Sequence, residues 1–299
     1  MSGLKTIGQV IDCELEGRTR NYIWRKTPSQ TTTIGIWFDL SMSPGMPVPK
    51  YWFDAAPLEA KAISQSSDGG FYHGPNVTGE KYLRRITTQA QATSTTQATP
   101  MNAILLDYLL YYPSIDDGVT AEQVMDNTVT LPRYTDGRGV QMMAVTTGLR
   151  TGGQTFQVKY TNSEGVTGRL SGICTQNAAA YIGSITNSGL LSTNGANWMI
   201  PLASGDTGVR AVESVTMISG VDVGLFSIIL VKPLAQTCFR EGGISTAGTI
   251  ATPYEKDFLV PTTDLIRIYN DAFLNFVVLP QAALNTTVLI GDLKVIWTD

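Results

Sequence analysis

The chain has 299 residues, of which 43% are hydrophobic and 15% are charged, and its formal net charge is −4 with a pI near 5.1. This length can bury a full hydrophobic core without disulfides. The acidic balance and the lack of clustered Lys and Arg argue against direct nucleic-acid binding, because phosphate neutralisation needs such clusters. The charged fraction is well below the roughly 25% of an average globular protein. Such a composition suits β structure with wide uncharged surfaces, as in proteins that pack many copies side by side.

Targeting and membrane segments are not recognisable in the sequence. Residues 1–10 lack the charged segment and apolar run of a signal peptide, and no stretch approaches the ~20 apolar residues of a membrane span. We therefore expect a soluble protein that is made in the cytoplasm and makes no membrane contact.

The cysteines and the single histidine do not indicate a metal site. Cys13, Cys174 and Cys238 are odd in number and form no C-x-x-C pair, so we expect reduced thiols. A Cys/His zinc site would need these three residues and His73 to converge, which their spacing gives no reason to expect. No metal and no cofactor is expected.

The first hundred residues mix short apolar runs with chain breakers. Residues 34–40, IGIWFDL, predict a buried strand, and the three prolines of residues 41–49 predict an ordered loop or extended arm. Tyr51-Trp52-Phe53 follows as an aromatic cluster that either anchors this loop to the core or reaches into a neighbouring subunit.

A domain boundary is predicted near residues 89–99, QAQATSTTQAT, because this stretch is uncharged and low in complexity. It divides the chain into an N-terminal β- and loop-rich arm or subdomain, residues 1–98, and a C-terminal β-sandwich or jelly-roll domain, residues 99–299. We expect removal of the N-terminal part to weaken assembly and to leave the C-terminal β core folded.

Two short helices are candidates in the next stretch. Residues 101–112, MNAILLDYLLYY, are long enough for three helical turns between Thr99-Pro100 and Pro113, although a buried strand pair is an alternative. Residues 121–125 suggest one helical turn.

The central stretch, residues 129–173, predicts a β-meander. Residues 140–147 and 155–161 are rich in β-branched and aromatic side chains, and the second run alternates apolar and polar positions. A third strand over residues 166–173 completes the meander, and the turns between the strands contain glycine.

The remainder of the chain predicts further strands. A polar run over residues 176–197 predicts a long exposed hairpin or loop, and residues 242–252 a second loop. Strands are expected at residues 214–218, at 223–231 with an end at Pro233, and at 258–260, 272–279, 287–290 and 293–297. We therefore expect a mainly β fold, a β-sandwich or jelly-roll-like architecture with long loops and at most one or two short helices.

Catalytic motifs are missing from the sequence, so we do not expect an enzyme. His73 has no nucleophile elbow nearby, and the glycines match neither a phosphate loop nor a dinucleotide fingerprint. The carboxylates that a glycosidase needs are formally available, and exposed aromatic side chains could instead bind sugar rings without cleavage. The candidates for such stacking are Tyr51, Trp52, Tyr72 and Trp198.

Several motifs resemble a group of virion structural proteins of tailed bacteriophages. They are LPRYTDGRGV at residues 131–140, FQVKYTN at 156–162, GDTGVR at 205–210, LVKPL at 230–234 and GDLKVIW at 291–297. The resemblance covers roughly residues 101–299. It implies a non-enzymatic virion protein, of the capsid shell or capsid-associated, that is made in the host cytoplasm. The partners implied are copies of itself, as a trimer or larger ring, and other virion proteins. A tail protein that recognises cell-surface carbohydrate is the alternative.

Interfaces of this kind use aromatic and Arg anchors in surroundings of low charge. The candidate interface residues are Arg133, Tyr134, Arg138, Tyr51 and Trp52. An equal alternative for Arg133 and Tyr134 is that they lock the entry to a strand by hydrogen bonding and packing.

Overall fold

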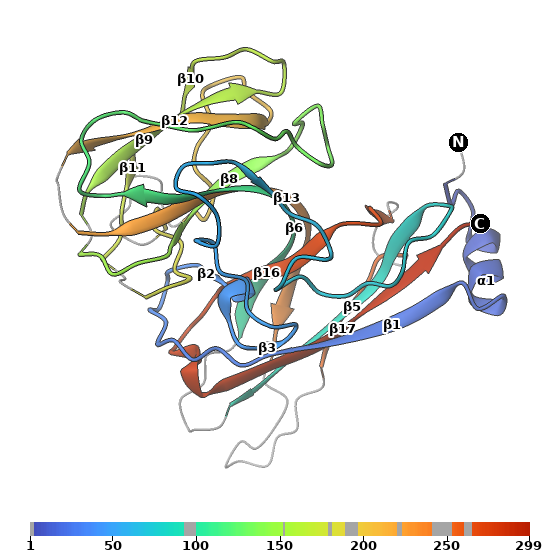
Figure 1. Cartoon of the computed structure of the whole chain (residues 1–299). Coiled ribbons are helices and arrows are strands. Elements are labelled where there is room, and N and C mark those ends of the chain that lie inside the picture. The colour runs from blue at the N-terminus through green and yellow to red at the C-terminus, as the bar shows by residue number, and fades with distance from the viewer. Residues whose placement is uncertain are drawn as a thin grey trace.

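The computed structural model describes residues 3–92, 100–151, 153–178, 181–188, 197–219, 223–240, 253–259 and 265–299. These residues form three antiparallel sheets, which confirms the mainly β, sandwich-like fold (Figure 1). In the described ranges α1, Ile7–Leu15, is the one α-helix, and Leu40–Met42 and Leu284–Thr286 are 3-10 turns.

The first sheet, here called the terminal sheet, has the strand order β14-β5-β17-β1-β3, with β15 beside β5. Its strands are β1 Thr19–Lys26, β3 Gly45–Met46, β5 Lys81–Ala92, β14 Tyr254–Asp257, β15 Ile266–Ile268 and β17 Thr287–Trp297. Strand β17 lies between β1 and β5, so the end of the described chain is paired on both sides. Gly291 of β17 leaves room for the ring of Trp24, its partner on β1, because a Cβ at residue 291 would lie 2.7 Å from that ring.

The central sheet has the order β2-β16-β6-β13-β8, with β4 beside β6. Its strands are β2 Phe38–Asp39, β4 Lys61–Ala62, β6 Met101–Asp116, β8 Gln141–Thr146, β13 Leu225–Phe239 and β16 Phe273–Leu279. The upper sheet has the order β10-β9-β12-β7, with β11 beside β9. Its strands are β7 Gln123–Val124, β9 Thr155–Asn162, β10 Arg169–Leu170, β11 Cys174–Thr175 and β12 Val209–Ser219.

The long strands β6 and β13 link the two other sheets. One end of this pair contributes Ala103, Leu105 and Phe239 to a core shared with the terminal sheet. The other end contributes Tyr112 and Phe226, among others, to a core shared with the upper sheet. Alternate side chains of the central sheet build a third core with the segment that contains Trp37, Trp52 and Ile63. The central sheet therefore belongs to two sandwiches at once.

The helix predicted over residues 101–112 is wrong; the alternative of buried strand structure is correct, although the segment forms the single strand β6 and not a strand pair. The segment is almost completely buried because β6 has neighbours in its sheet and cores on both faces, so its apolar run carries no period. Pro113 lies where the register of β6 against β13 shifts, so its missing N–H interrupts no regular pair. The turn predicted over residues 121–125 is also wrong, since it contains β7.

The meander is wrong in its pairing and correct in two of its three strands, because the third, predicted over residues 166–173, is strand only at Arg169–Leu170, in β10. Both β8 and β9 exist, and β9 alternates buried and half-buried positions as predicted. However, β8 pairs with β13, whereas β9 pairs with β12, β10 and β11. A period of two fixes which face of a strand is buried and does not select its partner.

Four other strand predictions need correction. The strand predicted at residues 258–260 is wrong in its described part, because Phe258 and Leu259 lie after the end of β14. Strand β13 continues through Pro233 to Phe239, with a register shift just after the proline. Of residues 34–40 only Phe38–Asp39 is strand, and Ile34 is exposed. The predicted strands 287–290 and 293–297 are the single strand β17.

The loop predictions have mixed outcomes. In residues 176–197 the exposed loop is wrong for the described part, where residues 184–188 are buried and bridge to β2 and β8. Residues 242–252 lie outside the described residues. The boundary near residues 89–99 stays a prediction, because residues 93–99 also lie outside them, although strands from both of its sides pair in the terminal and central sheets.

Candidate contact site at the seam of the two sandwiches

The seam between the two sandwiches is held by a buried ion pair. Asp107 lies on β6 between the two ends of the strand that belong to separate cores. Its carboxylate accepts hydrogen bonds from Nε and Nη2 of Arg133, at 2.9 and 2.8 Å. Arg133 also donates to the carbonyls of Ile63 and Tyr108 and to the carboxylate of Asp271. All five guanidinium N–H groups thus have an acceptor, and the loop that follows Leu131 is fixed to three parts of the chain.

Burial raises the pKa of Asp107 to about 6, and the opposing charge of Arg133 limits this rise. The carboxylate is therefore ionised at neutral pH. A third donor, the backbone N–H of Phe273 at 3.0 Å, also stabilises this charge.

The next residue, Tyr134, shapes the surface above the ion pair. Its φ of 50° turns the chain, and its ring packs edge-on against Tyr269 with a centroid distance of 5.0 Å. The ammonium of Lys232 lies 5.4 Å from the centre of the Tyr134 ring and donates to the carbonyl of Arg138 at 2.7 Å. Burial lowers the pKa of Lys232. The ammonium of Lys232, the rings of Tyr134 and Tyr269 and the loop that contains Arg138 therefore lie next to one another.

These residues line a surface cavity of about 580 Å³. Its lining is Pro132, Arg133, Tyr134, Thr135, Asp136, Arg138, Lys232 and Tyr269. Besides Arg133, which is bound by Asp107, the two aromatic rings, the cations of Arg138 and Lys232 and the hydroxyl groups can hold either a carboxylate-bearing side chain of a partner or a hydroxylated ring. We call this cavity the seam cavity; its described lining includes one carboxylate, that of Asp136, and not the pair of carboxylates that a glycosidase uses.

The structure brings together three of the five predicted interface residues. Arg133, Tyr134 and Arg138 all line the seam cavity, but Arg133 is buried, Tyr134 is half-buried and Arg138 is exposed. Tyr51 is exposed elsewhere on the surface, and Trp52 is fully buried. The alternative role of strand-entry lock therefore describes the contacts of Arg133, whereas Arg138 and Tyr51 are accessible to a partner.

Trp52 belongs to the core and not to a surface groove. Its indole stacks on Tyr108 with the centroids 5.5 Å apart, and its Nε1 donates to the buried carboxylate of Asp39 at 2.7 Å. Trp198 is also buried. Of the four aromatics considered for sugar stacking, Tyr51 and Tyr72 are exposed.

Sequence reasoning missed Asp107, Lys232 and Tyr269. Asp107 carried a usable signal, because a lone carboxylate inside an apolar run needs a cationic partner when the run is buried. Tyr269 and Lys232 come from segments more than 90 residues beyond the loop, so only the pairing of β13 and β16 with β6 places them.

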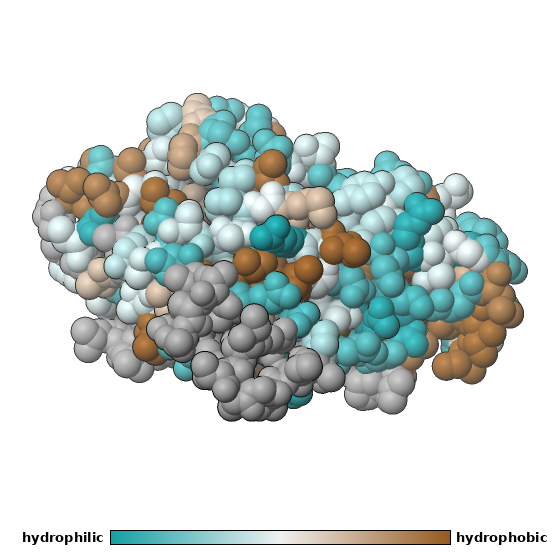
Figure 2. All heavy atoms as spheres, turned by 90° about the horizontal axis from the view of Figure 1, so that it is seen from below, coloured by the Kyte–Doolittle hydropathy of each residue, from teal (hydrophilic) through white to brown (hydrophobic). Residues whose placement is uncertain are grey.

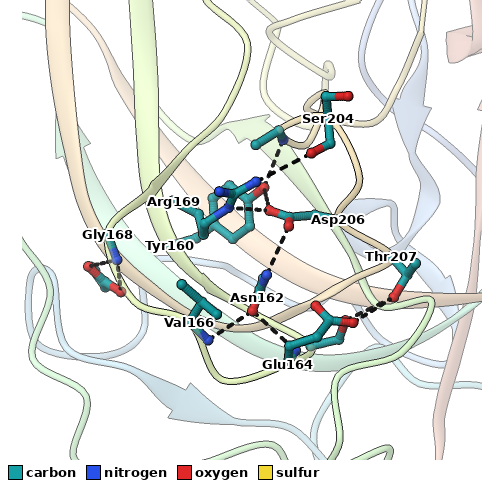
Figure 3. A network of polar contacts seen from close by, with 12 residues as sticks. Tyr160, Asn162, Glu164, Val166, Gly168, Arg169, Ser204, Asp206 and Thr207 are labelled. Carbon is teal, nitrogen blue, oxygen red and sulfur yellow. Dashed lines mark hydrogen bonds and ion pairs between the residues drawn. The ribbon is translucent and has the colours of Figure 1, made fainter.

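A second polar network fixes the upper sheet (Figure 3). Asp206 accepts from Tyr160 at 2.6 Å, from Asn162 at 2.8 Å and from Arg169 at 2.9 Å. The pKa of Asp206 is lowered to about 2, because these hydrogen bonds outweigh the cost of desolvation. Asn162 in turn accepts the N–H groups of Glu164 and Val166. The network ties the turn after β9 to the loop before β12 and has a structural role.

The three cysteines and the single histidine were the other residues considered for a metal site. Cys13, Cys174 and Cys238 are thiols that form no disulfide with one another, as predicted. His73 is buried, with Nε2 2.8 Å from the carbonyl of Ala272 and Nδ1 3.3 Å from the ammonium of Lys81. Within the described ranges, no group of three or more His, Cys, Asp or Glu side chains is arranged to hold a metal ion.

Large aliphatic side chains lie exposed on α1. Ile7, Ile11 and Leu15 are 66%, 51% and 80% exposed, and their spacing places them along one side of the helix. Figure 2 shows hydrophobic residues gathered at the end of the molecule where Figure 1 places α1, beside a mostly hydrophilic face. We call these three residues the α1 stripe.

Comparisons with known proteins add little to this description. No helix in the described part of the chain is long and apolar enough to cross a membrane. No protein-family model matches the chain, and a search of curated proteins finds no match. Among solved structures, one of infectious bursal disease virus, Gx strain, is similar with 10% identity and a TM-score of 0.14 over 94% of this chain and 80% of the other. A likeness at this level carries no argument about function.

Proposed function

We propose that this chain is a non-enzymatic virion structural protein that assembles with copies of itself and packs against other virion proteins in or on a capsid shell. The observation that carries the proposal is the α1 stripe, three large aliphatic side chains exposed on a regular element. Surfaces of this kind mark contacts between proteins, because leaving them in water is unfavourable.

Further support comes from two loops that are held in place by hydrogen bonds to charged side chains. The loop at the seam cavity is pinned by Arg133, and the loop before β12 is pinned by Asp206. Rigid loops lose little conformational entropy when a partner binds, which favours repeated assembly from one building block. The resemblance of residues 131–140 and 205–210 to phage virion proteins supports the same proposal.

The mass of the purified chain in solution tests this function. We expect light scattering to give particles of at least three times the 32.3 kDa of one chain, and cryo-electron microscopy to show ordered contacts. A chain that stays monomeric at every concentration would contradict self-assembly.

Carbohydrate recognition is a second candidate, and the seam cavity is the observation that favours it. Tyr134 and Tyr269 contribute two half-buried aromatic rings beside Lys232 and Arg138, which suits a hydroxylated or acidic sugar. We expect a glycan array to show binding that Tyr269→Ala abolishes and Tyr72→Ala leaves unchanged. Retention of binding in Tyr269→Ala would exclude this cavity.

A further inference from the structure

The helix α1 uses one side to hold the terminal sheet. Val10 and Cys13 pack against Tyr82 and Ile296, and the Cys13 thiol donates to the carbonyl of Trp297 at 3.3 Å. Thr6 and Gln9 form a capping box that fixes the first turn. The helix is therefore a firmly held element, and the exposure of its stripe is not a result of fraying at the chain end.

The α1 stripe lies on another side of this same helix. Ile7, Ile11 and Leu15 are four residues apart, so they form a continuous row of roughly 12 Å. Gly8 is exposed beside the row, and a Cβ there would meet no atom closer than 3.8 Å. A second helix can thus approach closely along this side.

The charges around α1 are opposite to those that stabilise an isolated helix. The first turn contains no acidic residue and the last turn no basic residue, while Lys5 precedes the N-terminus. The C-terminal half is acidic, since among the described residues its carboxylates form ion pairs with two cations, Lys294 and Arg18. These carboxylates belong to Asp12, Glu14, Glu16 and Asp299. The helix dipole favours the reverse arrangement.

A second copy of α1 that runs antiparallel to the first brings opposite charges together at both ends of the helix pair. It places the acidic C-terminal half of one helix beside Lys5 and the N-terminal N–H groups of the other. A parallel neighbour would place like charges together. The charge pattern therefore fits a second copy of this chain in the antiparallel direction.

We propose that two copies of the chain pair through α1, antiparallel, about a two-fold axis near Ile11, with Ile7 of each copy against Leu15 of the other. The pairing rests on the proposed function, in which copies of this chain assemble, and it names one contact of that assembly. A pair of nine-residue helices buries less than the roughly 1,000 Å² of a stable interface. Self-association through α1 is accordingly weak in solution and is strengthened when other contacts hold the copies together.

Sedimentation velocity of the full chain from micromolar to submillimolar concentration tests the pairing. We expect a concentration-dependent increase in mass, and we expect Ile11→Glu to weaken self-association by about tenfold or more. The matched control is Leu149→Glu, which places the same charge on a residue that is 77% exposed outside α1. This control should associate like the wild type.

A cross-link tests the geometry independently of affinity. Ile11→Cys brings two thiols to the two-fold axis, so mild oxidation should yield a disulfide-linked dimer, whereas Leu149→Cys should yield none above the wild-type background. Failure of Ile11→Cys to cross-link at concentrations where the protein associates would overturn the pairing.

Different results would contradict the α1 pairing and the proposed structural function. If the wild type and Ile11→Glu form the same assemblies, the α1 pairing is overturned and the proposed structural function stands. If the wild type is monomeric over the whole concentration range, both are overturned.

Discussion

At the scale of single residues, the ion pair of Arg133 and Asp107 connects the two sandwiches. Removing one member of a buried pair leaves an uncompensated charge and typically costs about 3–5 kcal/mol. We therefore expect Arg133→Ala to lower the free energy of unfolding by that amount in urea denaturation. The matched control is Arg138→Ala, an exposed neighbour in the same loop, which should change the free energy by no more than about 0.5 kcal/mol. Equal losses in both variants would show that the loop does not depend on the ion pair.

His73 should make the stability of the fold depend on pH. Burial, together with the nearby charge of Lys81, lowers the pKa of His73 to about 4. Because the folded-state pKa is below the unfolded value of about 6.5, the neutral ring stabilises the fold above that pH. This contribution, about 3 kcal/mol at most, is lost as the pH falls from 6.5 towards 4, since the unfolded chain binds the proton first.

The variant His73→Gln isolates this effect from other titrating groups. A glutamine amide can donate to Ala272 and accept from Lys81, and it does not titrate. Chemical denaturation at pH 7 and at pH 4.5 should show a steeper loss of stability in the wild type than in His73→Gln. Parallel losses would mean that the pKa of His73 does not differ between the folded and the unfolded chain.

At the scale of elements, the network around Asp206 holds the β9 turn to the loop before β12. Asp206→Ala leaves Tyr160 and Arg169 without this acceptor and frees the turn. We expect faster amide hydrogen exchange over residues 162–168 and 203–208, with unchanged protection in β6 and β13. Asp68→Ala, an exposed carboxylate outside the network, is the control and should leave exchange unchanged. Global loss of protection would show that the network supports the whole fold.

Elements also differ in how far the sequence reveals them. Strand β9 was predictable because one face is buried and the other is half-exposed. Strand β6 resembled a helix because burial on both faces removes the alternation. The helix α1 had a signal that the apolar pattern hides, the Thr6-x-x-Gln9 capping box.

At the scale of the whole molecule, the terminal sheet joins residues from both ends of the chain. Strands β1 and β5 lie on either side of β17, and they contribute Trp24, Leu83 and Ile86 to the core. The expectation that residues 99–299 fold alone therefore meets a physical difficulty, because β17 would lose both neighbours.

A fragment experiment tests this dependence. We expect residues 99–299 alone to lack a cooperative thermal transition by near-UV circular dichroism, because about a third of the chain and one wall of a core are missing. Co-expression with residues 1–98 should restore the transition if the pairing of β17 is sufficient to join the fragments. Cooperative unfolding of the C-terminal fragment alone would instead support the predicted boundary.

The sequence by itself determined the fold class and strands such as β8, β9, β12 and β16, because local hydrophobic patterns and turn residues act over a few positions. Tertiary structure alone decided that β8 and β9 belong to different sheets, since strand pairing depends on contacts between distant residues. It also decided the roles of the predicted interface residues. Arg133 and Trp52 are inside because Asp107 and Asp39 accept their N–H groups, whereas Arg138 and Tyr51 are outside.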